Sequence, residues 1–464
     1  MKQIAIYFLI PFLFHCSQPK TPESNKEADK TDNDIAFIDV NVIAMENEDI
    51  LEHQDVLIVD GKITKIAGHQ SFTIEENVTQ IDGKGKFLTP GLVELHAHIP
   101  VAKENDELVK ETLFLYLSNG ITTIRGMLGD PYHLKLQKEV ENGDILSPRI
   151  YTSGPSLNGN SVKTEEEAVA KVTAQKNAGY DFLKLHPGLK LEVFDAIVQT
   201  ANEVGIKYAG HVSIDVGIHH ALESGYWSID HLDGYMEGLV PESANVNPNE
   251  NGFFGFNFTP LADQSKIDEL AQKTKGADVW VVPTESLLER FTSSIPTSTL
   301  AQQEEMKYMN PGTIRDWITR KEQFLKANNY NQEMAEEFLK IRRQLIKSLH
   351  EKGAGLLLGS DAPQIFNVPG FSIQHEMGYM VEAGLSPFET LKIGTVNPSE
   401  FFDATGKFGK VKEGLSADLI LLSENPLDDI GNMKKIEGVS VRGKWLTKTF
   451  IQEQLEAIAN KYSQ

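Results

Sequence analysis

The spacing of apolar and polar residues changes several times along this 464-residue chain. These changes mark the boundaries of the helices and strands that the sequence predicts. In the middle, about residues 88–403, short apolar runs typical of buried strands alternate with longer segments of helical period. The strand-like runs cover residues 91–98, 120–127, 148–155, 180–187, 206–213, 226–233, 278–285 and 353–362. Strands that alternate with helices favour a parallel sheet, and eight of them predict an α/β fold with a closed (β/α)8, TIM-like barrel.

Two connections in this middle region are long. Residues 234–277 are rich in loop-forming residues, and residues 286–350, approximately, contain two charged segments of helical period. Long insertions on the catalytic face of a barrel often cover the active site. We therefore expect a helical insertion at about 286–350 that acts as a lid.

The sequence near both ends of the chain has the alternating apolar and polar pattern of short β-strands. Residues 35–87 alternate apolar runs with turns, and the pair Asp60-Gly61 is a strong hairpin signal. Residues 404–448 show the same pattern, and each segment is too small to fold well alone. The sequence thus predicts one small β-sandwich domain built from both chain ends, followed by a C-terminal helix at 449–464.

The extreme N-terminus is typical of an exported protein. Residues 4–14 are almost wholly apolar and follow Lys2, which matches a signal peptide in length and is too short to span a bilayer. Residues 17–34 are polar and read as a flexible tether. The arrangement resembles a bacterial lipoprotein precursor, with a signal at 1–16 and a lipid anchor on Cys16 that would hold the protein at the membrane. We expect a periplasmic or cell-envelope location; a signal peptide cut elsewhere, or left uncleaved, is the alternative.

Composition narrows the function further. The formal net charge of −22 argues against a nucleic-acid partner, which needs basic patches. Cys16 is the only cysteine, so an internal disulfide and a cysteine-based metal site are excluded. Residues 438–444 fit the first part of a phosphate-binding loop, but Trp445 stands where a serine or threonine is needed. The sequence also lacks the Gly-x-Ser-x-Gly and His-Glu-x-x-His motifs of other hydrolases.

Polar residues with metal-binding chemistry stand at the ends of the predicted strands. His96 and His98 end the first strand, and residues two apart on a strand point to the same side. His211, His231 and Asp361 end the fifth, sixth and eighth strands, at the mouth where barrel active sites lie. Burying such groups without partners would be costly, and shared metal ions would supply the partners.

Lys184 interrupts the apolar fourth strand. If CO2 adds to a neutral, desolvated amine, the carbamate that forms is an anionic ligand able to bridge two metals. The alternative is a lysine paired with a carboxylate, or one that extends to the barrel rim. The chemistry of lysine alone favours this alternative.

Several motifs in the same order resemble those of the amidohydrolase superfamily, in particular its imidazolonepropionase-like and prolidase-like branch. They are FLTPGLVELHAH, GITTIRGM, the strand-four lysine, AGHVS, SIDHLDG, LLLGSDAP and the tail GKVKEGLSADLILLSENPLDDI, and together they span about residues 36–447. The resemblance implies a metal-dependent hydrolase that cleaves an amide-like C–N bond in a small peptide-like, N-acyl or cyclic substrate.

The resemblance also implies roles for particular residues. One metal would be held by His96, His98 and Asp361, and the other by His211 and His231. A carboxylated Lys184 and a hydroxide would bridge them, with Asp361 as the proton shuttle. Zinc is the default for imidazole and carboxylate ligands, with manganese, iron and cobalt as alternatives.

Three further residues are candidates for substrate binding. Arg125 would bind a substrate carboxylate or form a structural ion pair, His186 would orient the substrate, and His375 would contact the substrate or pack its helix. Prolidase-like dipeptidases tend to carry a histidine after strand three, whereas residues 152–164 here lack one, so the substrate stays open. A lactone or ester hydrolase on the same site, and a tethered ligand-binding protein without catalysis, are the competing functions. The sequence does not indicate the oligomeric state.

Overall fold

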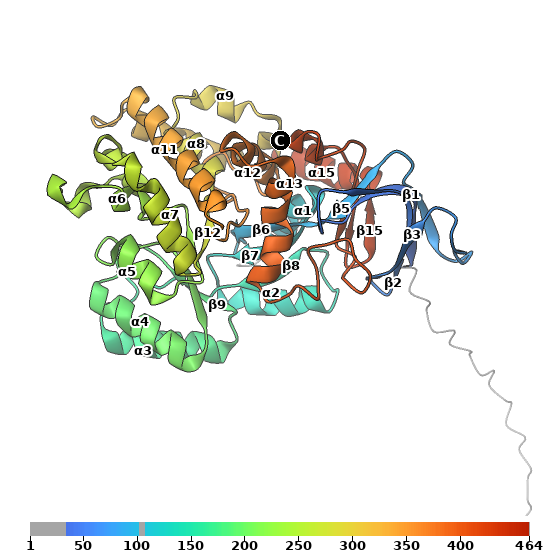
Figure 1. Cartoon of the computed structure of the whole chain (residues 1–464), viewed down its shortest axis with the longest axis horizontal. Coiled ribbons are helices and arrows are strands. Elements are labelled where there is room, and N and C mark those ends of the chain that lie inside the picture. Colours follow the sequence, from blue (N-terminus) through green and yellow to red (C-terminus); the bar gives the residue numbers. More distant parts are fainter. Residues whose placement is uncertain (1–33, 102–106, 464) are drawn as a thin grey trace, which may run out of the picture. The chain divides into compact units, whose positions relative to one another are not determined.

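The computed structural model describes residues 34–101 and 107–463 (Figure 1), so the predicted signal peptide, Cys16 and nearly all of the tether lie outside the described residues. In the described part, one mostly antiparallel sheet and two parallel sheets are surrounded by helices. No helix in these two ranges combines the length and apolar character needed to cross a bilayer.

Strands from both ends of the chain form a single eight-stranded sheet. Its strands are β1 (Ile35–Ile43), β2 (Ile50–Val59), β3 (Lys62–Gly68), β4 (Thr79–Asp82), β5 (Phe87–Pro90), β13 (Leu419–Leu422), β14 (Ile436–Val441) and β15 (Lys444–Thr447). The order is β15-β14-β13-β5-β1-β2-β3, with β4 paired to β1. Figure 1 shows the blue and red strands side by side at one end of the folded region.

The predicted hairpin joins β2 to β3 at Asp60 and Gly61, whose φ angles of 50° and 73° are those that a two-residue hairpin turn requires. A small apolar core covers the sheet, and Phe37 packs edge-on against Trp445 from the other end of the chain, with ring centroids 5.2 Å apart. The predicted sandwich needs correction: β5 hydrogen-bonds to both β1 and β13, so the two chain ends share one continuous sheet.

The middle of the chain contains two parallel sheets, which confirms the α/β class. One sheet has the order β6-β7-β8 and the other β12-β11-β10-β9. The strands are β6 (Leu92–Ala97), β7 (Ile121–Gly126), β8 (Arg149–Thr152), β9 (Phe182–Leu185), β10 (Lys207–Gly210), β11 (Ser228–Asp230) and β12 (Trp280–Val282). These strands are almost wholly buried, as expected where helices cover a parallel sheet.

Isolated bridges connect the two parallel sheets at both sides. Ser153 pairs with Phe182 next to β8 and β9. On the other side, the predicted eighth strand forms no regular strand, but its Leu356 pairs with Val281 and its Ala362 pairs with Ala97. Residues 353–362 therefore link β12 to β6 through single bridges.

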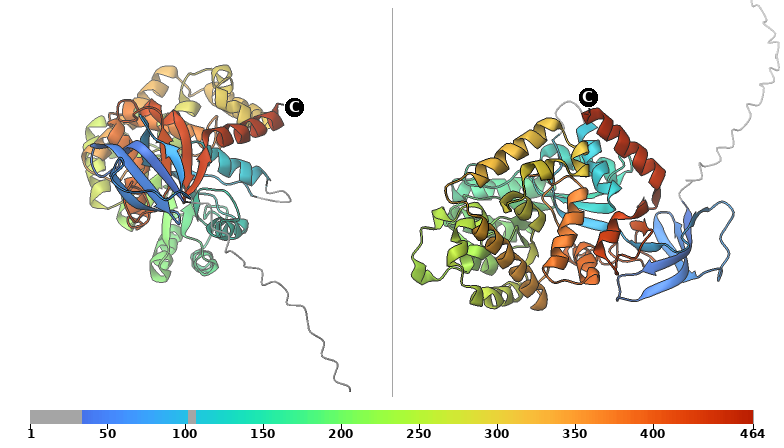
Figure 2. Two further views of the ribbon diagram at one scale, coloured as in Figure 1. Left: turned by 90° about the vertical axis from the view of Figure 1, so that its right-hand side faces the viewer. Right: turned by 90° about the horizontal axis from the view of Figure 1, so that it is seen from above.

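Helices follow the strands in the expected alternation. They are α1 (Glu107–Ser118), α2 (Pro131–Glu141), α3 (Glu165–Ala178), α4 (Leu191–Val204), α5 (Gly217–Ser224), α6 (Tyr235–Gly238), α7 (Ile267–Gly276), α12 (Phe371–Glu382), α13 (Pro387–Gly394) and α14 (Val396–Phe401). Thr164 caps α3 by accepting a hydrogen bond from the Glu167 amide, as its sequence indicates. The terminal helix α15 (Lys448–Tyr462) lies beside α1, where Lys461 and Tyr462 bind Glu111 (Figure 2).

The long insertion is helical. It consists of α8 (Glu285–Thr292), α9 (Thr297–Ala301), α10 (Pro311–Leu325) and α11 (Gln332–Glu351). The buried Lys321 of α10 donates hydrogen bonds to the carbonyl oxygens of Arg290 and Ser293 at the end of α8, at 2.6 and 2.8 Å. These bonds cap the free carbonyls of α8 and hold α10 against it.

Candidate active site

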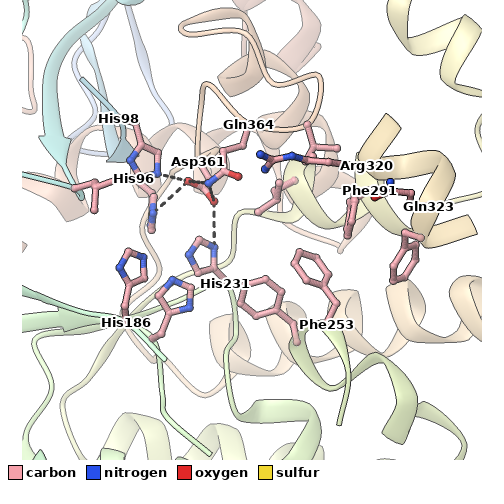
Figure 3. A pocket seen from close by; sticks show the side chains of 16 residues that line it. His96, His98, His186, His231, Phe253, Phe291, Arg320, Gln323, Asp361 and Gln364 are labelled. Atoms are coloured by element: carbon pink, nitrogen blue, oxygen red, sulfur yellow. Dashed lines mark hydrogen bonds and ion pairs between the residues drawn. The ribbon is translucent and has the colours of Figure 1, made fainter. Parts of the chain in front are cut away.

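A pocket of about 660 Å³ lies where β6, β10 and β11 end (Figure 3). Its walls come from the strand ends, the segment after β11 and the helical insertion. It is lined by His96, His98, Leu128, His186, His211, His231, Phe253, Phe254, Leu287, Phe291, Arg320, Gln323, Phe324, Asp361, Gln364 and Ile365. The predicted imidazoles and Asp361 are thus gathered in one place from strands far apart in the sequence.

His96, His98 and Asp361 form the tightest cluster. Their ligand atoms all lie within 4.8 Å of one another, a spacing that could hold a metal ion. His98 Nε2 lies 2.6 Å from Asp361 Oδ1, and His96 Nε2 lies 3.4 Å from the same oxygen. The backbone fixes this geometry, because the Asp361 amide donates to the His96 carbonyl and the His98 amide donates to the Ala362 carbonyl.

His211 and His231 lie directly beside this cluster. The His231 ring centroid is 4.4 Å from that of His96 and 4.7 Å from that of His211. His186 extends the row, with its ring 4.8 Å from His211. Its position at the pocket is compatible with the predicted role in orienting a substrate.

Each buried imidazole has a neighbour on its Nδ1 atom that the sequence analysis missed. Asp230 Oδ2 lies 3.0 Å from His96 Nδ1, although the pair is not aligned as a hydrogen bond. The corresponding contacts are Asp233 Oδ2 to His211 at 3.0 Å and Thr284 Oγ1 to His231 at 2.8 Å. Such neighbours fix the ring orientation of metal-binding histidines. Asp230 and Asp233 lie within two residues of His231 in the motif SIDHLDG. Their closeness in sequence to a predicted metal ligand could have indicated that they contact the histidines of the site.

Burial lowers the pKa values of four imidazoles in the site, those of His96, His186, His211 and His231. Burial, followed by the nearby Lys184, lowers the pKa of His211 to about 3. Burial also lowers the pKa of His186 to about 2, and it holds the pKa values of His96 and His231 well below their usual range. Neutral imidazole is the form that binds a metal, so these rings are ready ligands at neutral pH.

Lys184 is fully buried on β9, and its Nζ atom has no hydrogen-bond partner among the described residues. Asp230 Oδ2, the same oxygen that faces His96, lies 3.7 Å away. Burial lowers the pKa of Lys184 against the opposing pull of Asp230 and Asp361. A buried, unsatisfied amine beside neutral imidazoles and a carboxylate fits a site completed by divalent metal ions, and zinc suits this set of donors.

Arg125 lies outside the pocket, so its predicted contact with a substrate carboxylate needs correction. Its guanidinium is fully buried and donates to the Leu95 carbonyl, Ser228 Oγ and Asp230 Oδ1 at 2.6, 2.8 and 3.0 Å. These contacts use its donors within the core, and they correspond to the structural ion pair that was the alternative.

Removing this guanidinium should destabilise the fold. In Arg125→Met, Asp230 loses its buried partner, and breaking such a pair costs about 3–5 kcal/mol. Urea unfolding of the metal-free protein measures the loss. Lys412→Met, at a solvent-exposed pair with Glu46, is the control and should cost about 1 kcal/mol or less. Equal effects of the two variants would contradict the assignment of Arg125 to the structural core.

His375 also lies away from the pocket. Its Nε2 atom lies 2.8 Å from Glu305 Oε1, and the residue lines a separate cavity between α12 and the C-terminal helix α15. The predicted contact with the substrate is therefore replaced by a hydrogen bond between α12 and the insertion. The pocket instead contains residues that the sequence analysis did not select, namely Phe253, Phe254, Phe291, Arg320, Gln323, Phe324 and Gln364.

Comparisons with known proteins identify the family of this chain. The model of the amidohydrolase family matches residues 87–446, and the chain belongs to this family. The predicted assignment to the amidohydrolases is thus confirmed.

Its relatives include an ochratoxinase of Aspergillus niger, 25% identical over 329 residues that cover 68% of this chain and 62% of the ochratoxinase. An imidazolonepropionase of Geobacillus sp. (strain WCH70) is 20% identical over 416 residues, 80% of this chain and 84% of the relative. The chain therefore spans less than two thirds of the length of the ochratoxinase.

Solved structures show the same fold. A bottromycin amidohydrolase superposes with a TM-score of 0.71 at 20% identity, over 93% of this chain and 91% of the other. A Xaa-Pro dipeptidase with bound methionine in its active site superposes with a TM-score of 0.64 at 18% identity, over 89% of this chain and all of the other (100%).

Proposed function

We propose that this protein is a metal-dependent hydrolase that cleaves an amide-like C–N bond in a small substrate. The observation that carries the proposal is the convergence of His96, His98, His211, His231 and Asp361 on one pocket next to the buried Lys184. Membership of the amidohydrolase family supports this chemistry, and so does the structural similarity to a protein named bottromycin amidohydrolase.

The donor set supports two metal positions. His96, His98 and Asp361 would hold one divalent ion, and His211 and His231 the other, with a carboxylated Lys184 between them. When bound, such ions lower the pKa of water and polarise a carbonyl oxygen. Zinc is our first choice, and manganese, iron and cobalt are alternatives.

The chain's own residues supply positioning and proton transfer. Asp361 accepts the proton of the attacking water and passes it to the leaving nitrogen as the C–N bond breaks. Gln364 Nε2 lies 3.4 Å from both carboxylate oxygens of Asp361 and limits its rotation. Asp233 and Thr284 hold the rings of His211 and His231, so the site does not reorganise during the reaction.

A closed barrel would place these ligands at one mouth. We propose that the two parallel sheets and residues 353–362 complete an eight-strand barrel, which the bridges at Ser153, Leu356 and Ala362 support. We also propose that the protein is exported and carries a lipid anchor on Cys16. Cell fractionation of the wild type and of a Cys16→Ala variant tests this location.

Metal analysis tests the function directly. Purified protein should contain about two divalent ions per chain. A chelator should remove them and abolish hydrolysis of amides, and zinc or manganese should restore it. Metal-replete protein that binds small amides tightly without cleaving any of a broad amide panel would contradict hydrolysis and favour a ligand-binding role. Cleavage restricted to lactones or esters would replace C–N by C–O hydrolysis.

A further inference from the structure

The pocket has one aromatic wall that begins at the candidate metal ligands. The Phe254 ring lies 5.1 Å from the His231 ring and 5.8 Å from the His211 ring, measured between centroids. Phe253 continues the row at 4.6 Å from Phe254, and Phe291 lies 4.6 Å from Phe253. All of these phenylalanines, together with Phe324 of α10, line the cavity. Phe253 packs edge-on against both Phe254 and Phe291, and together these rings offer a large apolar surface to a ligand.

The backbone holds this wall in a costly conformation. Phe254 has φ 50° and ψ 42°, in the left-handed region that a bulky residue rarely adopts. Gly255 follows with φ 79°, and a Cβ atom there would lie 2.5 Å from Met236 Cβ, so only glycine fits. Strain of this kind persists where the surrounding structure enforces it, often at ligand sites. Here it directs the Phe254 ring over the imidazoles.

The helical insertion also presents a cation to the pocket. Arg320 of α10 is the one lysine or arginine among the lining residues of the described chain. Its guanidinium has no ion pair or hydrogen bond to any described residue, whereas the neighbouring Lys321 anchors the helix to the end of α8. Figure 3 shows Arg320 directed toward Gln364 and Asp361. A fixed helix therefore presents an unpaired guanidinium to the space next to the reacting centre.

We propose that the substrate is an amide with both a carboxylate, bound by Arg320, and a bulky apolar or aromatic group, packed on Phe253, Phe254, Phe291 and Phe324. N-acyl derivatives of large apolar amino acids have this chemistry. Water adds across the amide, the C–N bond breaks, and the products are a carboxylic acid and an amino acid. The proposal rests on the proposed hydrolysis, and it disfavours neutral lactones and small cyclic amides, which offer no carboxylate to the guanidinium of Arg320.

The size of the site agrees with such a substrate. A cavity of about 660 Å³ falls within the range of roughly 300–1,000 Å³ that binds molecules of this kind. A planar guanidinium and a carboxylate form two parallel hydrogen bonds, which give direction as well as affinity. Arg320 is thus a specificity-determining residue, distinct from the groups that carry out bond cleavage.

The test compares two probes on the metal-loaded full chain. N-benzoyl-L-phenylalanine carries the carboxylate, and N-benzoyl-L-phenylalaninol replaces it with an alcohol. Arg320→Met should lower kcat/KM for the carboxylate probe about 10–100-fold, as expected for a charge-assisted contact, and leave the alcohol probe nearly unchanged. Arg315→Met, an exposed arginine on the same helix outside the pocket, should change neither probe. Equal losses of both probes in Arg320→Met would overturn the proposal.

A second pair of substrates tests whether the aromatic wall selects large apolar groups. Phe291→Leu and Phe324→Leu should lower kcat/KM for N-benzoyl-L-phenylalanine by about 3–10-fold relative to N-acetylglycine. Phe388→Leu, which lines a different cavity, is the matched control. A uniform effect on both substrates would contradict a role of this wall in selecting large groups.

Two outcomes separate this proposal from the proposed function. If wild type cleaves cyclic amides but not these probes, the substrate class is wrong and hydrolysis stands. If nothing is cleaved, hydrolysis fails, and calorimetric binding of the two probes still decides the role of Arg320. Weaker binding of the carboxylate probe alone in Arg320→Met supports it, and unchanged binding overturns it.

Discussion

Asp361→Asn should lower kcat by about 10²–10⁴-fold, the usual contribution of a general acid–base residue. Asparagine keeps the size of the side chain, but its amide nitrogen cannot accept the proton of the attacking water. The replacement also alters a contact of 2.6 Å with His98 Nε2, so part of the loss will come from weaker metal binding. Steady-state kinetics and metal content, measured on the same preparation, separate the two causes.

The matched control for this variant is Asp403→Asn. Asp403 is an exposed aspartate with φ 52°, a conformation that asparagine tolerates as well, and it lies outside the pocket. Its replacement should leave both kcat and metal content unchanged. An Asp361→Asn enzyme that keeps full kcat with full metal content would remove Asp361 from proton transfer.

Lys184→Met should remove metal and activity together. The Lys184 amine is fully buried with no hydrogen-bond partner in the described chain, which supports the metal-bridging role proposed above. Without the bridge we expect metal content to fall from about two ions per chain to about one or fewer. Elemental analysis gives the metal content, and an added mass of one CO2 on the native lysine would identify the carbamate.

Stability supplies an independent readout for the same lysine. The Lys184 amine has one long contact of 3.7 Å with Asp230 Oδ2 and no hydrogen bond, so the metal-free Lys184→Met protein should lose less stability than a variant that removes a hydrogen-bonded buried amine. Lys321→Met is the matched control, because Lys321 is also fully buried but donates to two carbonyl oxygens. It should lose stability and keep its metal ions. Unchanged metal content in Lys184→Met would exclude the bridge.

The sequence was informative where local pattern and chemistry coincide. Alternating strand-like and helix-like periods predicted the α/β class, and the histidines at strand ends predicted a shared pocket. The eighth strand-like run differs, because residues 353–362 pair only at isolated positions although their apolar character is that of a buried strand. A run of apolar residues indicates that a segment is buried. It does not indicate whether the backbone of that segment forms the regular hydrogen bonds of a strand.

Side-chain partners were the least predictable part. Arg125 and His375 were both plausible ligands for a substrate, but tertiary contacts with Asp230 and Glu305 occupy them inside the protein. The residues that replace them in the pocket, Arg320 and Phe254, come from loops and helices whose position over the strand ends no local signal encodes. Which side chains reach the pocket depends on how the long insertions pack against the strand ends.

The sheet shared by the chain ends has a consequence for how the protein is made. β5 pairs with β13, from Leu88 opposite Leu421 to Pro90 opposite Leu419, and it continues directly into the strand that carries His96. Until a ribosome has released residues 419–422, β5 has an open edge toward which other nascent chains can pair. Assembly of the candidate site therefore waits until residues 419–422 have been synthesised, and truncations that remove β13 should yield aggregated protein instead of a smaller folded one.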